Sequence, residues 1–334
     1  MEHFASAEGT ETIDVPHVGT EDYDGYDFLG YPQRKGWSRN QLMGDQNFGN
    51  KKPEEVEAFF QTWLYFGCLI SVFGLAGIEV KTCDFVRETE KGEKIITTKL
   101  LPRFIQDWMN REGMHDDRYR TLAPDHFREK LDESGKRDRG PIVEKILRRV
   151  LFFVERYCNQ KAHDEAETIG TKPPFWPMSP KIAMSIMAIG KPLMHVAVEI
   201  YGYPRYQEPG WGSSPFLNER LVRAGWCVGE VPLFGKRAAI DCDYYFGAYS
   251  SPRKQLDHEN CTKAGCRARI TDVTVYRTKH ASPCRDCRFI DAPGEVVEIV
   301  KQECIPIVSW KDGELTVAKY DKESKSKYVA ISHV

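Results

Sequence analysis

Between residues 258 and 287 the chain gathers side chains that bind soft metal ions. This stretch holds four of the ten cysteines and two of the nine histidines. Written as spacing, it reads H-x2-C-x4-C, then a gap of thirteen residues, then H-x3-C-x2-C. Two short-spaced ligand groups separated by about a dozen residues are typical of a tetrahedral zinc site, because each group can close on the ion from a tight turn. A bound ion would constrain the fold directly, since its binding contributes free energy to folding.

The spacing offers six candidates for the four positions of a tetrahedral ion, so it leaves the ligand set open. The C-x2-C pair at Cys284 and Cys287 is the firmest, and Cys261 and Cys266 come next. His280 is an alternative to one of these thiolates, and we interpret the first histidine of the stretch as a neighbour of the site. The predicted metal ligands are therefore drawn from Cys261, Cys266, His280, Cys284 and Cys287.

The alternatives to zinc are disulfide bonds and redox chemistry at the C-x2-C pair. The chain opens with Glu2 and His3 and shows no basic segment followed by an apolar run, so it lacks the pattern of a secretory signal. We therefore expect a soluble, cytoplasmic protein with reduced cysteines, which favours zinc over disulfides. A redox motif is disfavoured because no strand–helix pattern surrounds the pair.

Composition narrows the class of protein but names no partner. With 334 residues and 41% hydrophobic residues, the chain is long enough for a buried core. The formal charge of −2 indicates no general attraction to nucleic acid or to membranes. The most apolar window, residues 59–75, contains Gln61, Thr62 and Ser71 and is expected to fall short of a membrane span.

Three regions are expected along the chain. Eight acidic residues and no Lys or Arg occur before Gly30. This one-signed charge predicts that residues 1–50 form a largely disordered segment. The aromatic residues near Tyr23 and Phe28 offer an alternative, in which this segment docks on the body of the protein. Residues 51–250 are expected to form a helical domain, and residues 251–334 a Cys/His-rich α+β subdomain. The predicted fold class is therefore mainly α, a multi-helix body with a small C-terminal α+β part containing zinc-stapled turns and a β-hairpin.

Apolar spacing and helix-start signals place the expected helices. Pro53 with two following acids predicts the start of a central core helix, which is apolar nearly all round through Phe73. Further helices are expected at residues 97–109, from Pro141 to 157, from Pro180 to 200 with a kink or break at Gly190 and Pro192, at 216–224 and at 237–249.

The C-terminal part carries strand signals. A helix from Pro293 precedes an apolar strand at residues 305–310, and Asp312-Gly313 predicts a tight hairpin turn into a returning strand. A further strand is expected within residues 270–276, and another at residues 327–334. Because the chain stops inside this last strand, we expect the natural protein to be longer.

The final motif resembles the opening of the fungal heterokaryon-incompatibility (HET) domain, and motifs before it resemble the region that precedes this domain in many fungal proteins. This resemblance implies a regulatory or recognition role in non-self recognition and cell death, with a protein partner or the missing HET domain as the partner. Only the first strand of the HET domain is present, and the last cysteine pair is C-x2-C where relatives are expected to have C-x-C. The motifs are KYVAISHV at 327–334, ERLVRAGWC at 219–227, YRTKH at 276–280, WLYFG at 63–67, the His258/Cys261/Cys266 cluster and the Cys284/Cys287 pair.

Three classes of function remain open on sequence grounds. A non-catalytic regulatory module with a structural zinc ion is favoured, because no catalytic constellation stands out. A zinc enzyme is disfavoured because most candidate ligands are cysteines, whereas catalytic sites keep an open position. Nucleic-acid binding is disfavoured because acidic residues dilute the basic ones and no recognition helix separates the ligand groups. Cys227 is a lone cysteine that could be a nucleophile, a further metal ligand or simply buried.

Overall fold

The computed structural model describes residues 1–4, 12–44, 48–49, 51–112, 136–159, 178–202, 211–237, 240–252, 254, 256–268 and 293–321. The chain divides into two compact units, Met1–Thr271 and Asp272–Val334. In the residues described, the first unit is helical with one small hairpin and the second holds a helix and a hairpin, which confirms the predicted mainly α fold with a small C-terminal α+β part. The division falls later than the expected boundary after residue 250, so the first half of the cysteine-rich stretch belongs to the helical unit.

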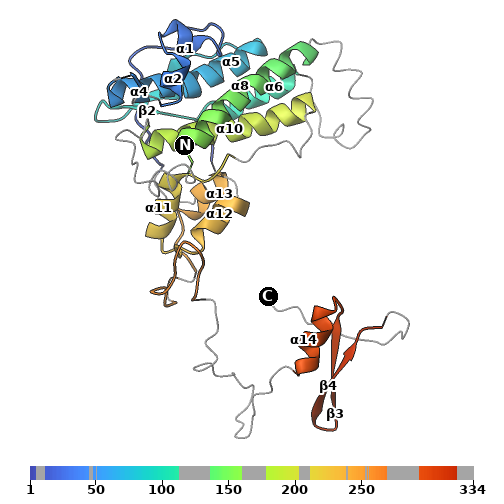
Figure 1. Ribbon diagram of the computed structural model, residues 1–334. Coiled ribbons are helices and arrows are strands. Elements are labelled where there is room, and N and C mark those ends of the chain that lie inside the picture. Colours follow the sequence, from blue (N-terminus) through green and yellow to red (C-terminus); the bar gives the residue numbers. More distant parts are fainter. Residues whose placement is uncertain are drawn as a thin grey trace. The chain divides into compact units, whose positions relative to one another are not determined.

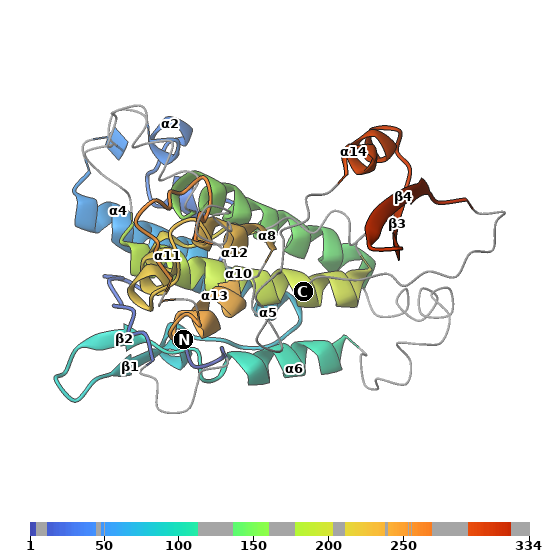
Figure 2. The same cartoon turned by 90° about the horizontal axis from the view of Figure 1, so that it is seen from below.

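The first unit is built around three long helical segments (Figure 1). They are the continuous segment α4–η1–α5, helix α8 and helix α10. Segments α8 and α10 run alongside each other, and α5 packs against α8. Helix α6 closes the other side, where Phe104 and Trp108 contact Phe73 of α5 (Figure 2). The elements are α1 (Tyr31–Arg34), α2 (Arg39–Leu42), α4 (Pro53–Phe60), η1 (Gln61–Gly67), α5 (Cys68–Leu75), η2 (Thr82–Phe85), β1 (Val86–Glu88), β2 (Lys94–Ile96), α6 (Leu101–Arg111), α8 (Lys136–Tyr157), α10 (Pro180–Tyr201), α11 (Pro215–Arg223), α12 (Val231–Arg237) and α13 (Ile240–Phe246).

The central core helix is present from Pro53 to Leu75, as predicted. Pro53 occupies the first turn, and the Glu55 carboxylate accepts a hydrogen bond of 3.0 Å from the Lys52 backbone N–H. The middle of the segment, η1, is a π-helix in which every residue is buried. A π-helical stretch widens the backbone locally and is often found at functional positions. Here it offers the buried Gln61 side chain to a neighbouring segment.

The N-terminal residues pack on this π-helix, which differs from the expected disordered segment. The Gln61 amide donates to the Pro16 carbonyl at 2.9 Å and accepts from the Val18 N–H at 2.8 Å. The Trp63 indole donates to the Phe28 carbonyl at 2.9 Å. Gly67 leaves room for the Tyr23 ring, which a Cβ at that position would overlap. The count of acids alone predicts this segment wrongly, because Ile13, Val15, Tyr23 and Phe28 are buried in the core while the neighbouring Asp14, Glu21 and Asp22 are exposed.

Several helix boundaries differ from expectation for identifiable reasons. Helix α8 begins at Lys136, before Pro141, so this proline lies inside the helix instead of opening it. Helix α10 runs unbroken across Gly190 and Pro192, because packing holds both ends of it in the core. The helix expected at 237–249 is present but shorter, as α13 from Ile240 to Phe246, and a separate short helix, α12, precedes it.

Two helical segments, Pro53–Leu75 and Pro180–Tyr201, are long and apolar enough to cross a membrane. In each, 78% of the most apolar window is buried inside the protein. Burial of this extent is what core helices of a soluble protein show. The first segment contains the window expected to fall short of a membrane span, residues 59–75; it is long and apolar enough by length and composition only, and its surroundings are those of a core helix.

The second unit contains α14 (Gly294–Lys301) and the antiparallel pair β3 (Pro306–Lys311) and β4 (Glu314–Lys319). Asp312 and Gly313 have φ angles of 52° and 85°, which is the left-handed pair that a two-residue hairpin turn of this type requires. The predicted helix and hairpin are therefore confirmed. The strands expected at 270–276 and 327–334 lie outside the described residues.

Glycine at position 190 is required by the packing of α10. A Cβ at Gly190 would overlap the Trp211 ring, whereas one at Gly74, inside α5, would meet open space. We expect Gly190→Ala to lower the free energy of unfolding by about 1–3 kcal/mol through overpacking. We expect Gly74→Ala to raise it by up to about 1 kcal/mol through helix propensity. Urea unfolding of the two variants measures both, and equal effects of the same sign would contradict the assigned packing.

Asp243 makes the stability of the fold depend on pH. This carboxyl is fully buried, and neither oxygen has a hydrogen-bond partner in the described part of the protein. Desolvation, together with nearby Asp241, raises its pKa from 3.8 to about 7, against the opposing effect of Lys191. Because the pKa is higher in the folded state, the stability linked to the neutral carboxyl is lost as the pH rises from about 4 through 7.

We expect Asp243→Asn to be more stable than the natural chain at pH 8 by on the order of 2 kcal/mol. At pH 5, where Asp243 already carries its proton, this advantage should largely disappear. Urea unfolding at the two pH values measures the difference, with Asp138→Asn, at an exposed position, as the matched control. The same shift in both variants would show that burial of Asp243 is not the cause.

Candidate metal centre

Cys227 is placed by the way helix α11 ends. Gly225 takes a φ of +87°, and the Trp226 N–H donates to the Leu221 carbonyl at 3.0 Å, so the chain turns sharply out of the helix. The Trp226 indole then donates to the Phe246 and Tyr249 carbonyls, each at 3.2 Å. This anchors the residue before Cys227 to the end of α13. The Cys227 side chain follows directly and is 4% exposed.

The other three residues lie on one short loop. The Cys261 N–H donates to the His258 carbonyl at 3.0 Å, which closes a tight turn between the two side chains. Thr262 and Gly265 then exchange two backbone hydrogen bonds of 3.2 and 3.0 Å. This small loop brings Cys266 back beside Cys261. The spacing H-x2-C-x4-C therefore corresponds to two consecutive turns, as the sequence predicted for this group.

Glycines allow the two segments to touch through their backbones. A Cβ at Gly229 would overlap the Gly265 carbonyl carbon and the Cys266 backbone nitrogen. Only a residue without a side chain permits this approach. The contact holds Cys227, two residues before Gly229, next to the loop that carries the other three side chains.

The four side chains converge on one point. Their ligand atoms, the Sγ atoms of Cys227, Cys261 and Cys266 and a ring nitrogen of His258, all lie within 4.8 Å of one another. The Sγ atoms of Cys261 and Cys266 are 3.8 Å apart, and His258 Nδ1 lies 3.6 and 3.8 Å from them. This Cys3His cluster could hold a metal ion.

Backbone N–H groups point at two of the sulfurs, as they do around bound thiolates. The Arg267 N–H donates to Cys261 Sγ at 3.1 Å, and the Gly229 N–H donates to Cys227 Sγ at 3.3 Å. Desolvation raises the pKa of Cys261, but hydrogen bonds from the Ala268 N–H, His258 and the Arg267 N–H outweigh it and lower the pKa to about 6. Burial raises the pKa of Cys227 to about 11. The Cys261 thiol therefore ionises easily near neutral pH. The buried Cys227 thiol keeps its proton at neutral pH, and a metal ion would displace this proton on binding.

The cluster agrees with only part of the ligand set drawn from the sequence. Cys261 and Cys266 come together as predicted. His280, Cys284 and Cys287 lie outside the described residues, so their assignment stays a prediction. The structure adds the remaining two members, Cys227 and His258.

The two added members, Cys227 and His258, differ in how clearly the sequence points to them. His258 was interpreted as a neighbour, although its spacing to Cys261 matched that of a ligand. Cys227 was left among several alternatives, because no second cysteine or histidine lies close to it in sequence. The available signal was Gly229, since a glycine two residues after a cysteine can direct its N–H at the sulfur.

The chemistry of the cluster is that of a closed site. Three thiols and one imidazole supply four ligands, which is the full coordination of a tetrahedral ion. The two acids next to His258 in sequence, Asp257 and Glu259, are both exposed, and the Glu259 N–H donates to the Asp257 carboxylate in a local turn. Nothing in these contacts provides the open position of a catalytic metal.

Comparison of the chain with models of protein families, with curated proteins and with solved structures finds no match.

The backbone contact at Gly229 provides a test of the cluster. We expect Gly229→Ala to separate Cys227 from the loop and to weaken metal binding by about tenfold or more, as loss of supporting groups does at metal sites. Gly265→Ala is the matched control, because a Cβ there meets nothing within 4 Å. Competition with a chromophoric chelator measures both affinities. Equal affinities in the two variants would contradict the assigned contact.

Proposed function

We propose that this chain is a non-catalytic regulatory or recognition region of a HET-type protein, in which a structural zinc ion fixes the end of the helical unit. The observation that carries the proposal is the convergence of Cys227, His258, Cys261 and Cys266. The ion would join the turn after α11 to a loop more than thirty residues later in the chain. Cross-linking of this kind stabilises a small segment that has little core of its own.

Zinc is the ion proposed for the cluster, because the ligand types and the separations between their atoms are close to those of a tetrahedral zinc site. Bonds of about 2.3 Å to sulfur and about 2.0–2.1 Å to nitrogen, at tetrahedral angles, place two sulfurs about 3.8 Å apart and a sulfur and a nitrogen about 3.5–3.6 Å apart. The separation of Cys261 Sγ from Cys266 Sγ is 3.8 Å, and those of Cys261 Sγ and Cys266 Sγ from His258 Nδ1 are 3.6 and 3.8 Å. Three thiolates and an imidazole are also a common structural zinc set.

A structural role is favoured over a catalytic one. A catalytic zinc keeps three protein ligands and an open position for water or substrate. Here four protein ligands are already gathered, and Cys227 is buried beneath the turn that carries it. The chain would therefore act through the surface that the ion holds in place, and not through chemistry at the ion.

The HET assignment rests on the resemblance and gains one support from the structure. Two motifs that carry the resemblance, ERLVRAGWC at 219–227 and the His258/Cys261/Cys266 group, are distant in sequence. They supply the four members of a single cluster. Motifs that share one site are expected to occur together. The proposed partner is a HET domain, or a protein that controls one, and the proposed location is the cytoplasm.

Metal content tests the ligand set. We expect the purified chain to contain zinc, and Cys227→Ser to lose it from this cluster. Because the cluster is complete without the predicted pair at Cys284 and Cys287, Cys284→Ser should retain at least one zinc per chain. Elemental analysis of the two variants decides between the sets. Zinc retained in Cys227→Ser and lost in Cys284→Ser would contradict the proposal.

The regulatory role is tested in fungal cells. We expect growth arrest when this chain is joined to a HET domain, and none when the chain is expressed alone. We further expect Cys227→Ser in the joined protein to change the extent of growth arrest. Cys83→Ser, at an exposed position outside the cluster, should leave the extent of growth arrest unchanged. Arrest by the chain alone would show that the activity resides here and would overturn the proposal.

A further inference from the structure

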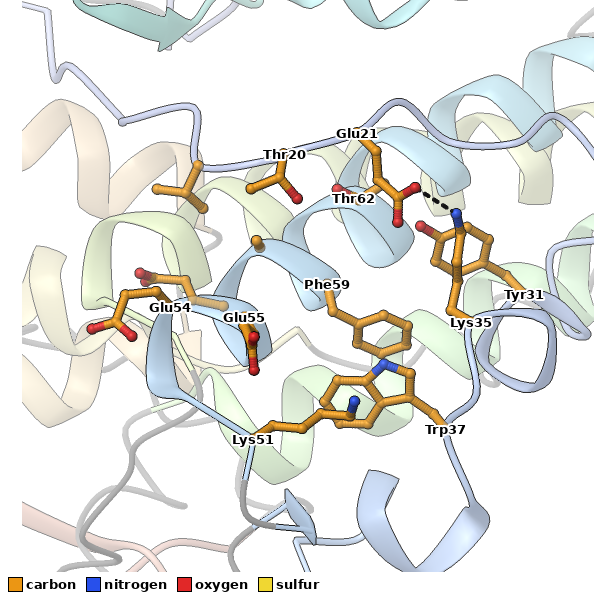
Figure 3. Close-up of a pocket in the computed structure, with 13 residues that line it drawn as sticks. Thr20, Glu21, Tyr31, Lys35, Trp37, Lys51, Glu54, Glu55, Phe59 and Thr62 are labelled. Atoms are coloured by element: carbon orange, nitrogen blue, oxygen red, sulfur yellow. Dashed lines mark hydrogen bonds and ion pairs between the residues drawn. The ribbon is translucent and has the colours of Figure 1, made fainter.

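A second site lies in the helical unit, formed by the N-terminal segment, α1 and the start of α4 (Figure 3). It is a pocket of about 360 Å³, which is at the lower end of the size of small-molecule sites. Its lining comes from three stretches that are separate in sequence, residues 18–21, 31–37 and 51–62. None of these residues belongs to the metal cluster.

The wall of the pocket is aromatic. The rings of Trp37 and Phe59 are stacked with centroids 4.1 Å apart, and the rings of Tyr31 and Phe59 are stacked with centroids 5.8 Å apart. All three residues are buried, so their positions are fixed by the core. An aromatic face is electron-rich and attracts cations, most strongly when the ring is that of tryptophan.

The chain itself shows which groups these rings accept. The Lys51 ammonium lies over the Trp37 ring, 4.9 Å from its centroid. The Lys35 ammonium lies 5.6 Å from the Tyr31 centroid and forms a 2.8 Å ion pair with Glu21 (Figure 3). Ammonium groups at an aromatic face with a carboxylate beside them are the arrangement that recognises organic cations.

Carboxylates outnumber the lysines around this wall. Four acids and two lysines line the pocket, which gives a net charge of −2 from two positive and four negative groups. The partial positive charge at the start of α4 offsets only part of this excess. Glu54 makes no hydrogen bond or ion pair with any described residue, so its carboxylate is available. The acids are Glu21, Glu54, Glu55 and Glu57.

We propose that this pocket binds an organic ammonium cation, with the cation over the Trp37 ring and Glu54 and Glu21 as the acids that attract it. The aromatic wall selects a cation that carries methyl or methylene groups over a bare metal ion, because such a cation also buries apolar surface. Lys51 is then a competitor, because its ammonium occupies the ring face that the ligand needs. The ligand displaces this side chain into solvent when it binds.

Choline is the first probe, and 3,3-dimethylbutan-1-ol is its control, since it has the same shape without the charge. Calorimetry of the full chain at low salt should show saturable binding of choline and about tenfold weaker binding of the alcohol. The indole N–H signals in NMR should show that Trp37 is the ring affected. Equal binding of the two compounds, or no saturation by choline up to about 10 mM, would overturn the proposal.

Two variants shift the affinity in opposite directions. Glu54→Gln should weaken choline binding about threefold, because it removes a carboxylate that attracts the cation. Lys51→Ala should strengthen binding by a similar factor, because it removes the ammonium that competes for the Trp37 ring. Glu79→Gln is the matched control, since Glu79 is exposed and pairs with Lys81 outside the pocket. A change in Glu79→Gln as large as that in Glu54→Gln, or weaker binding in Lys51→Ala, would contradict the proposed site.

An organic ammonium ligand of this kind could be a free amine or a methylated lysine of another protein. Trimethyl-lysine as the free amino acid and within a short peptide distinguishes these sources. Tighter binding of the peptide by tenfold or more identifies a protein side chain as the ligand, and equal binding identifies a small molecule. Failure of both, with choline also inactive, would overturn the proposal.

Discussion

The close approach of two backbones at Gly229 and Gly265 is the constraint on which the metal centre depends. It requires a residue without a side chain at position 229, and it places Cys227 where no local sequence spacing could. The sharp end of α11, the anchoring of Trp226 and the turn at Cys261 all serve to bring these two segments together. An ion held between them would stabilise the folded state directly, because the four ligands come together only when the chain is folded.

The core of the helical unit supports both proposed sites, the metal cluster and the cation pocket. The π-helical middle of the central segment binds the N-terminal residues through Gln61 and Trp63. This docking forms one wall of the pocket and completes the aromatic core around Phe59. At the other end of the unit, α10 packs against α11 and α13, and Cys227 follows α11. The core thus positions Cys227 of the metal cluster and the aromatic wall of the proposed cation pocket.

Elements with strong local signals could be predicted from sequence, and long-range contacts could not. The start at Pro53 and the turn at Asp312-Gly313 follow from dihedral preferences of single residues, and both were correct. The prediction of disorder in the N-terminal segment was wrong for the residues described, because a count of charges does not show which side chains face the core. Val15 and Tyr23 are two that do. Cys261 and Cys266 were found because their spacing is local. Cys227 was not assigned, since its place in the cluster depends on a contact between backbones distant in sequence.

The central claim is that three sulfurs and one imidazole of this chain share one ion. X-ray absorption of the zinc-loaded protein tests it most directly, because the spectrum counts sulfur and nitrogen ligands at the metal. The account predicts three sulfurs at about 2.3 Å and one nitrogen at about 2.0–2.1 Å, with the nitrogen replaced in His258→Cys by a fourth sulfur. A shell of oxygen and nitrogen without sulfur, or an unchanged spectrum in His258→Cys, would contradict it.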